Sequence, residues 1–257
     1  SRLRQALMKP SSPAPTDAAI FMRNVHVSYG KFKAVENIDF EVKTGEFFGL
    51  IGLNGAGKTT LIKTLLDLRA QESGTVQIYG RAVDDKMVKQ RLAVLPERFE
   101  PSWFLSGLEF LKFSAQLYGR DLTDERCIDY AQRISLDTGA LKRRVHTYSK
   151  GMRQKLGLLG TVLTGCDLLI LDEPMSGLDP IARAHTKELL LEAKSNGCTI
   201  FLSSHILADM DEICDRVSIL HDQRILFTGT PADFKSQNTS ETLEQAFLHF
   251  IEEKSAA

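Results

Sequence analysis

The clearest chemistry in the sequence lies in a glycine-rich loop, residues 52–60, which reads GLNGAGKTT. Glycine lets backbone N–H groups turn inward around an anion, where any Cβ would obstruct them. Lys58 is placed to reach the β- and γ-phosphates of a nucleoside triphosphate, and Thr59 to give its hydroxyl to a bridging Mg²⁺ ion. We therefore expect the nucleotide to be bound by these loop residues: Asn54, Gly55, Ala56, Gly57, Lys58, Thr59 and Thr60.

Three further polar residues follow apolar segments later in the chain. Asp172 and Glu173 come directly after the apolar run 168–171, and His205 comes shortly after the run 198–202. Continuous apolar runs suit parallel strands buried on both faces, and such sheets bind ligands at the carboxyl ends of their strands. Asp172 is thus placed to hold the Mg²⁺ shell, and Glu173 to act as general base on the water that attacks the γ-phosphate. For His205 we expect contact with the γ-phosphate.

The elements that must position these residues follow the order strand, loop, helix. An apolar run at 47–51 precedes the glycine loop, and a helix is predicted over 58–68, so that its positive N-terminal end faces the anion. Alternation of apolar and polar residues predicts half-exposed antiparallel strands at 19–27 and 38–42. Further strands are predicted at 75–79, 167–172 and 198–202, and a strand pair at 216–220 and 225–228, joined by a turn at Asp222 and Gln223.

Helical spacing of apolar residues replaces the strand pattern from about residue 97 to residue 163. Near its end, the turn 148–152 (YSKGM) opens a helix that runs through 155–163, with Ser149 as the N-cap. A last helix is predicted over 241–251, with its apolar side formed by Leu243, Ala246, Phe247, Phe250 and Ile251. The predicted fold is α/β, that of a P-loop NTPase (RecA-like): a mostly parallel sheet with an N-terminal antiparallel β subdomain and an inserted α-helical subdomain.

Length and composition allow a substantial core and no strong overall charge. The chain has 257 residues, 43% of them hydrophobic, which suits one large domain or two closely packed subdomains. Its 32 Lys and Arg against 33 Asp and Glu leave a formal net charge of -1, so no overall field draws it to nucleic acid or to an anionic membrane. No run of about 18 apolar residues and no secretory signal is found, so we expect no membrane span.

The cysteines and the first residues bear on where the chain works. Cys127, Cys166, Cys198 and Cys214 show no C-x-x-C pairing, and two of them lie in apolar, strand-like surroundings. We infer a reducing, cytosolic compartment and no metal site of cysteines. Residues 1–9 are basic, and we expect a mobile tail followed by a Pro- and Ser-rich linker over 10–15. The alternative is a short basic amphipathic helix that touches a membrane or a partner.

The glycine loop, the 148–152 turn, the Asp172-Glu173 pair and His205, in this order, resemble the motif set of the nucleotide-binding subunit of ABC transporters. The resemblance runs from about residue 19 to residue 229. It implies a Walker A motif at 52–60, a Walker B motif at 168–172, Glu173 as the catalytic glutamate, a D-loop at 176–179 and His205 as the switch histidine. We expect a tail and linker at 1–18, an ABC ATPase domain at 19–240 with its helical subdomain at about 97–163, and a C-terminal helix and tail at 241–257.

The resemblance also bears on the base and on a second subunit. Tyr29 lies between the first two predicted strands, and on the residues alone its ring either stacks on a nucleotide base or packs near a turn. The resemblance implies adenine stacking. It further implies a head-to-tail dimer, either a homodimer or a pseudo-symmetric heterodimer, in which Ser149 and Gly151 of one subunit cap the γ-phosphate held by Lys58 of the other.

Two positions depart from the common family pattern. The turn 148–152 keeps the serine and the second glycine of the usual Leu-Ser-Gly-Gly-Gln, and Glu97 stands where a glutamine usually follows Leu-Pro. A carboxylate there still helps to hold a metal-bound water, so we include Glu97 among the catalytic and metal-site residues, but it adds charge beside Mg²⁺. Both variants, and the ending at 244–248, are similar to the exporter subfamily whose ATPase pairs with a separate small membrane subunit.

The resemblance implies an ATPase at the cytoplasmic face of the membrane, which powers transport, in the direction of export, through an integral membrane permease. A coupling helix of that permease would dock near an apolar group whose alternative role is to pack the insertion: Pro101, Trp103, Phe104 and Leu105. The alternative function is a soluble ABC-type ATPase acting on nucleic acid or ribosomes. Its usual coiled-coil insertion, zinc-binding cysteine pairs and second ATPase half are not found in this sequence, so no nucleic acid is expected. An inert ATP-binding homologue is a third reading, against which Lys58, Asp172, Glu173 and His205 are all in place.

Overall fold

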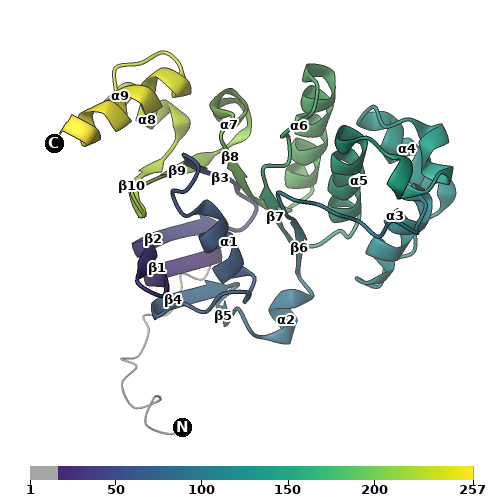
Figure 1. The fold of residues 1–257 in the computed structure, drawn as a ribbon, viewed down its shortest axis with the longest axis horizontal. Helices are drawn as coiled ribbons and strands as arrows, with labels where there is room; N and C mark the ends of the chain where they lie inside the picture. Colours follow the sequence, from purple (N-terminus) through teal and green to yellow (C-terminus); the bar gives the residue numbers. More distant parts are fainter. Residues whose placement is uncertain (1–16, 257) are drawn as a thin grey trace, which may run out of the picture.

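The computed structural model describes residues 17–256, so the expected basic tail and the linker after it lie outside the described residues. A first, antiparallel sheet has the strand order β2-β1-β4-β5 (Figure 1). Its strands are β1 (Ala18–Tyr29), β2 (Phe32–Lys43), β4 (Ser73–Ile78) and β5 (Arg81–Ala82). The predicted antiparallel strands are thus confirmed. Both run further than predicted, because β1 and β2 stay paired up to Tyr29 and Phe32.

A second sheet has the order β10-β9-β3-β8-β7-β6. Its strands are β3 (Phe47–Gly52), β6 (Leu92–Leu95), β7 (Leu168–Asp172), β8 (Thr199–Ser204), β9 (Arg216–His221) and β10 (Arg224–Gly229). All neighbouring pairs are parallel except β9 and β10, which form the predicted hairpin. Asp222 and Gln223 turn this hairpin with φ of 46° and 68°, as a two-residue turn requires. The mostly parallel sheet is confirmed, and the short strand β6 was not predicted.

The central strands of the second sheet, β3, β7 and β8, are buried on both faces, which explains their continuous apolar runs. In β3, Phe47 and Ile51 face one hydrophobic core, while Phe48 and Leu50 face the other. The second core joins the two sheets through stacked rings: the Phe48 centroid lies 5.7 Å from that of Phe40 and 6.1 Å from that of Phe201. Helix α1 (Lys58–Leu65) packs between the sheets, in contact with β2, β3 and β4.

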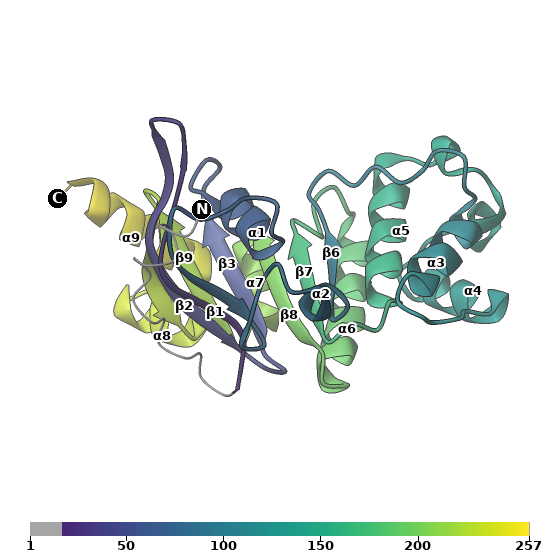
Figure 2. The same cartoon turned by 90° about the horizontal axis from the view of Figure 1, so that it is seen from below.

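Apart from the short helix α2 (Lys86–Lys89), the other helices form three groups. The helical unit consists of α3 (Gly107–Gln116), α4 (Asp124–Arg133), the short helices η2 (Thr138–Lys142) and η3 (Val145–Thr147), and α5 (Lys150–Val162). It lies at the β6 end of the sheet, drawn in teal in Figures 1 and 2. At the opposite end lie α8 (Pro231–Gln237) and α9 (Leu243–Ala256), while α6 (Pro180–Ser195) and α7 (Leu207–Ile213) follow β7 and β8. Between β5 and β6 lies the single-turn α2. None of these described helices is long and apolar enough to cross a membrane.

Helix ends show where sequence patterns succeed and fail. The expected N-cap is confirmed, since Ser149 Oγ accepts a hydrogen bond from the Met152 N–H at 3.2 Å. The predicted end of the first helix at residue 68 is wrong, because α1 stops at Leu65. Asp67 there takes a φ of 60°, and the N–H of Leu68 turns back to the carbonyl of Lys63 at 2.9 Å, closing the helix. The predicted apolar side of the last helix is confirmed: Leu243, Ala246 and Phe247 are buried, and Phe250 and Ile251 pack against them.

Candidate nucleotide-binding site

The glycine loop connects β3 directly to α1. At Gly57 the backbone has a φ of 114°, and a Cβ there would lie 2.5 Å from Val35 Cγ1 and 2.8 Å from the Ala34 carbonyl oxygen. Only glycine fits this position without strain. The loop is consequently pressed against β2 on one side while Asn54 and Gly55 remain exposed on the other.

Lys58 is the buried cation of the site. Its Nζ donates to the carbonyl oxygen of Gly52 at 2.6 Å and lies 3.9 Å from Glu173 Oε1. Burial lowers the pKa of Lys58, and the nearby carboxylates of Glu173, Asp172 and Glu97 act in the opposite direction. A buried ammonium group of this kind can form charge-assisted hydrogen bonds with the oxygens of a further anion, such as a phosphate.

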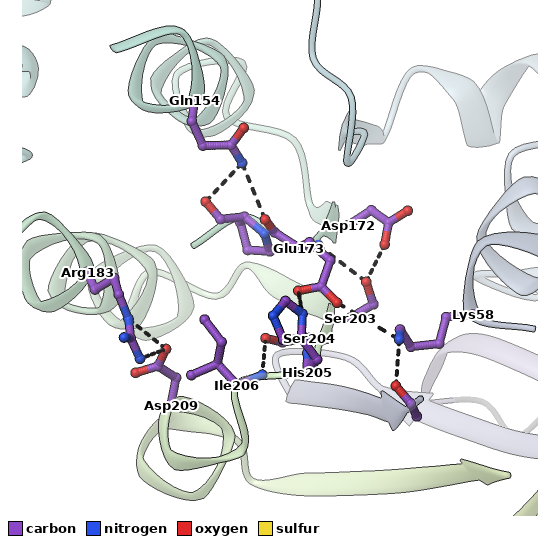
Figure 3. A network of polar contacts seen from close by, with 12 residues as sticks. Lys58, Gln154, Asp172, Glu173, Arg183, Ser203, Ser204, His205, Ile206 and Asp209 are labelled. Carbon is purple, nitrogen blue, oxygen red and sulfur yellow. Dashed lines mark hydrogen bonds and ion pairs between the residues drawn. The ribbon is translucent and has the colours of Figure 1, made fainter. Parts of the chain in front are cut away.

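Asp172 ends β7 and lies beside Ser203, the residue that pairs with it on β8. The Ser203 hydroxyl donates a hydrogen bond to Asp172 Oδ1, which fixes the carboxylate (Figure 3). Burial raises the pKa of Asp172; the hydrogen bond from Ser203 opposes the rise, and the charges of Glu97 and Glu173 add to it. Sequence analysis assigned no role to Ser203. The feature that could have indicated it is that Ser203 stands near the end of a predicted parallel strand, as Asp172 does.

Glu173 is held in an unusual backbone conformation, with a φ of 52°. Its N–H donates to the Ser203 carbonyl oxygen at 3.1 Å, and its Oε2 lies 2.8 Å from Nδ1 of His205. From α5, Gln154 Nε2 donates to the carbonyl oxygens of Glu173 at 3.4 Å and Pro174 at 3.0 Å, so the turn after β7 is tied on two sides (Figure 3). Such strain in a fully braced turn is typical of functional positions. Gln154 was not among the predicted site residues.

A cavity of about 500 Å³ brings most of the predicted residues together. Its lining includes eleven of them: Tyr29, Asn54, Gly55, Gly57, Lys58, Thr59, Thr60, Glu97, Asp172, Glu173 and His205. It also includes four residues for which no contact with the nucleotide was predicted: Phe32, Ala34, Leu53 and Ser176. We call this cavity the nucleotide pocket. It opens at the carboxyl ends of β3, β7 and β8, as expected for a parallel sheet.

Three predicted residues are not in the lining of this pocket. Ala56 is buried in the loop, and Ser149 and Gly151 lie at the start of α5. A Cβ built on Gly151 would be 3.7 Å from the carbonyl oxygen of Gly177, so this helix start adjoins the 176–179 segment of the same chain.

A somewhat larger cavity, about 570 Å³, lies elsewhere and includes Arg120, Cys166 and Cys198. It sits at the amino ends of β7 and β8, away from the glycine loop. Burial raises the pKa of Cys198 to about 12 and also raises that of Cys166, so both thiols stay protonated near neutrality. Because none of the predicted reactive groups lines it, the smaller cavity is the candidate site for the nucleotide.

The fold and this pocket define a P-loop NTPase: a strand, a glycine loop with a buried lysine, and a carboxylate at the end of a neighbouring strand. The family model described as ABC transporter matches residues 35–176, more than half of the chain. The chain belongs to this family, and its fold is that of an ABC ATPase.

Individual relatives and a solved structure support membership of this family. An uncharacterized ABC transporter ATP-binding protein of Synechocystis is 38% identical over 79% of this chain and 58% of its own length. The chain thus spans less than two thirds of that relative. A fluoroquinolones export ATP-binding protein of Mycobacterium tuberculosis is 35% identical over 79% of this chain and 67% of its own length. A solved structure of the ATP binding subunit of an ABC transporter superposes with a TM-score of 0.80 at 32% identity, covering 90% of this chain and 98% of its own.

Proposed function

We propose that the chain hydrolyses ATP to power transport, in the direction of export, through a partner integral membrane permease at the cytoplasmic face of the membrane. The observation that carries the hydrolytic part is the meeting of Lys58, Glu173 and His205 in one pocket beside Asp172. The direction of transport is supported by the fluoroquinolones export relative and by the exporter-like variants at Glu97 and 148–152.

ATP would occupy the nucleotide pocket with its phosphates on the glycine loop and its base against Tyr29, which is 41% exposed. The pocket also offers a donor set that suits a hard cation: the exposed Thr59 hydroxyl and the carboxylates of Asp172 and Glu97. These residues would hold Mg²⁺, which when bound neutralises charge on the β- and γ-phosphates. Lys58 would add a second positive charge at the same place.

In this proposal Glu173 takes the proton from the attacking water, and His205 orients its carboxylate. Nδ1 of His205 lies on Oε2, which leaves Oε1 toward Lys58 and the phosphate side of the pocket. The His205 side chain is 58% exposed, so its other nitrogen is accessible to a γ-phosphate oxygen. Glu97, also exposed in the lining, would act on the metal-bound water.

Two subunits would close the site between them. Ser149 and Gly151 lie outside the pocket of their own chain, at the N-terminal end of a 13-residue helix, where backbone N–H groups are available to an anion. We therefore assign them to the γ-phosphate bound by the opposite subunit of a head-to-tail dimer.

The permease would dock on the helical unit. Trp103 and Phe104 are 49% and 82% exposed and form a hollow with Arg144 and His146. Pro101 is buried and Leu105 half-buried, so these two pack the unit itself. Exposed aromatic rings next to Arg are the usual anchors of protein interfaces.

The test uses Glu173→Gln, which should hold the ATP-bound dimer, purified with Mg²⁺ATP from detergent-solubilised native membranes. Mass spectrometry should find one polytopic membrane protein in about equal amount. The matched control adds Lys58→Ala, which removes the phosphate contact and should abolish dimerisation. Recovery of ribosomes or DNA-repair proteins in place of a membrane protein would contradict the proposal and favour the soluble ATPase.

A further inference from the structure

Arg69 packs on the ring of Tyr29 from a segment that sequence analysis left without a role. Its guanidinium carbon lies 4.4 Å from the Tyr29 ring centroid, within the range of a cation–π contact. The same guanidinium donates a hydrogen bond to the carbonyl oxygen of Ser28. One side chain therefore holds both the backbone and the ring at the end of β1.

Tyr29 contacts Arg69 and also lines the nucleotide pocket. The lining of the pocket, taken over the described residues, includes Tyr29 but not Arg69. The guanidinium thus packs against the ring without taking space from the pocket, and the surface that remains is available to a planar base.

The segment that carries Arg69 is itself braced. The N–H of Arg69 donates to the carbonyl oxygen of Lys63 at 3.2 Å, in the last turn of α1. Further along, Glu72 bonds twice to β1: its N–H donates to the His26 carbonyl oxygen at 2.8 Å, and its carboxylate accepts from Ser28 Oγ at 3.1 Å. The segment around Arg69 is therefore hydrogen-bonded to α1 on one side and to β1 on the other.

Helix α1 connects the two ends of the nucleotide pocket through these contacts. It begins with Lys58 at the phosphate loop, and its last turn holds the residue that packs on Tyr29. Residues that grip opposite ends of one ligand are most effective when a rigid element fixes their separation.

We propose that Arg69 is a positioning residue for the nucleobase: it holds the Tyr29 ring as the wall on which the base of the bound nucleotide stacks. This inference rests on the proposed binding of ATP in the pocket. It predicts that Arg69 contributes to binding only through the base, and only through Tyr29.

The test compares two ligands of the full chain, MgATP and Mg-tripolyphosphate, which has the phosphates without ribose or base. Arg69→Met keeps the aliphatic length and removes the guanidinium. We expect the Kd for MgATP to rise about three- to tenfold, while the Kd for tripolyphosphate is unchanged. Tyr29→Leu should show the same selectivity, and the double variant should lose no more than Tyr29→Leu alone, because the two residues act as one unit.

The matched control is Arg91→Met, which removes a guanidinium 3.8 Å from the ring of Tyr79, outside the pocket; neither Kd should change. An equal rise of both Kd values in Arg69→Met would overturn the inference, and so would an unchanged Kd for MgATP. A double variant that binds MgATP more weakly than Tyr29→Leu alone would also overturn it. A wild-type chain that binds tripolyphosphate and not ATP would instead overturn the proposed function, and this inference with it.

Discussion

The imidazole of His205 lies directly on the carboxylate of Glu173, with Nδ1 2.8 Å from Oε2. The backbone N–H of His205 points to the same oxygen at 3.4 Å. His205 directly follows β8 and Glu173 directly follows β7, and these two strands are neighbours in the sheet. Glu173 is therefore oriented by a residue 32 positions away, and its other oxygen faces Lys58.

From this contact we predict that His205→Ala lowers the ATPase rate by about 10²-fold while the Kd for ATP changes little. The alanine leaves Glu173 without its orienting partner, although the phosphate loop is untouched. Steady-state ATPase assays and nucleotide binding on the same preparation provide the check. A parallel loss of binding and turnover would show that His205 supports the fold of the pocket and not the reaction.

An ion-pair cluster around the buried Asp209 joins α6 to α7. Asp209, only 4% exposed, accepts from Arg183 Nη2 at 2.6 Å (Figure 3). It also lies 3.4 Å from Lys187 Nζ. Asp209→Asn leaves Arg183 facing a neutral amide, while Lys187 keeps Glu212 as a partner, and we expect the change to lower the free energy of unfolding by about 3 kcal/mol. Glu212→Gln is the matched control, because Glu212 pairs with Lys187 at the surface and is 60% exposed, so it should change stability by less than about 1 kcal/mol. Urea unfolding of the two variants decides the matter: similar values for both would contradict a buried role for Asp209.

The ionisation of Glu36 should make the free energy of unfolding depend on pH in the acid range. Hydrogen bonds from Arg224, the larger effect, and from Lys33 lower the pKa of Glu36 from 4.5 to about 2. Because the folded pKa lies below the unfolded one, this stabilisation is present above about pH 4.5 and is lost as the pH falls toward 2. Glu36→Gln and Arg224→Gln should both flatten the decline of unfolding free energy across that window. If wild type and both variants decline in parallel, the contact does not act in solution.

Trp103→Ala should weaken assembly with the permease and leave ATP binding intact, because the ring is 49% exposed on the helical unit and absent from the lining of the nucleotide pocket. Leu248→Ala on α9 is the control, since that side chain is 59% exposed at the opposite end of the molecule (Figure 1). Co-purification with the membrane subunit and nucleotide binding are measured together. Loss of both in Trp103→Ala would show that Trp103 packs the insertion instead.

The sequence was sufficient to predict the placement of residues that lie close together in the chain. The loop around Lys58 needs only its neighbours, and Asp172 follows from one apolar run. The end of α1 was predicted wrongly because the left-handed turn that closes the helix occurs at Asp67, and an aspartate at this place is not a clear signal for a helix end. The helices α6 and α7 were also not foreseen.

The residues that hold the site residues in place could not be predicted from the sequence, for a different reason. Ser203 meets Asp172, and Gln154 meets the turn after Glu173, only because β7 lies between β6 and β8 with α5 packed near its end. Strand order is a property of the folded chain, so such contacts become visible only in three dimensions. The Arg69–Tyr29 contact belongs to the same class, since it joins segments 40 residues apart.

The most direct test of the account is single-turnover ATP hydrolysis by wild type and Glu173→Gln, with the Kd for MgATP measured on both. Glutamine keeps the shape of Glu173 but cannot accept the proton, so we predict a rate at least about 10²-fold lower with ATP bound as tightly or more tightly. Retention of a near wild-type rate by Glu173→Gln would contradict the assignment of Glu173 as the general base.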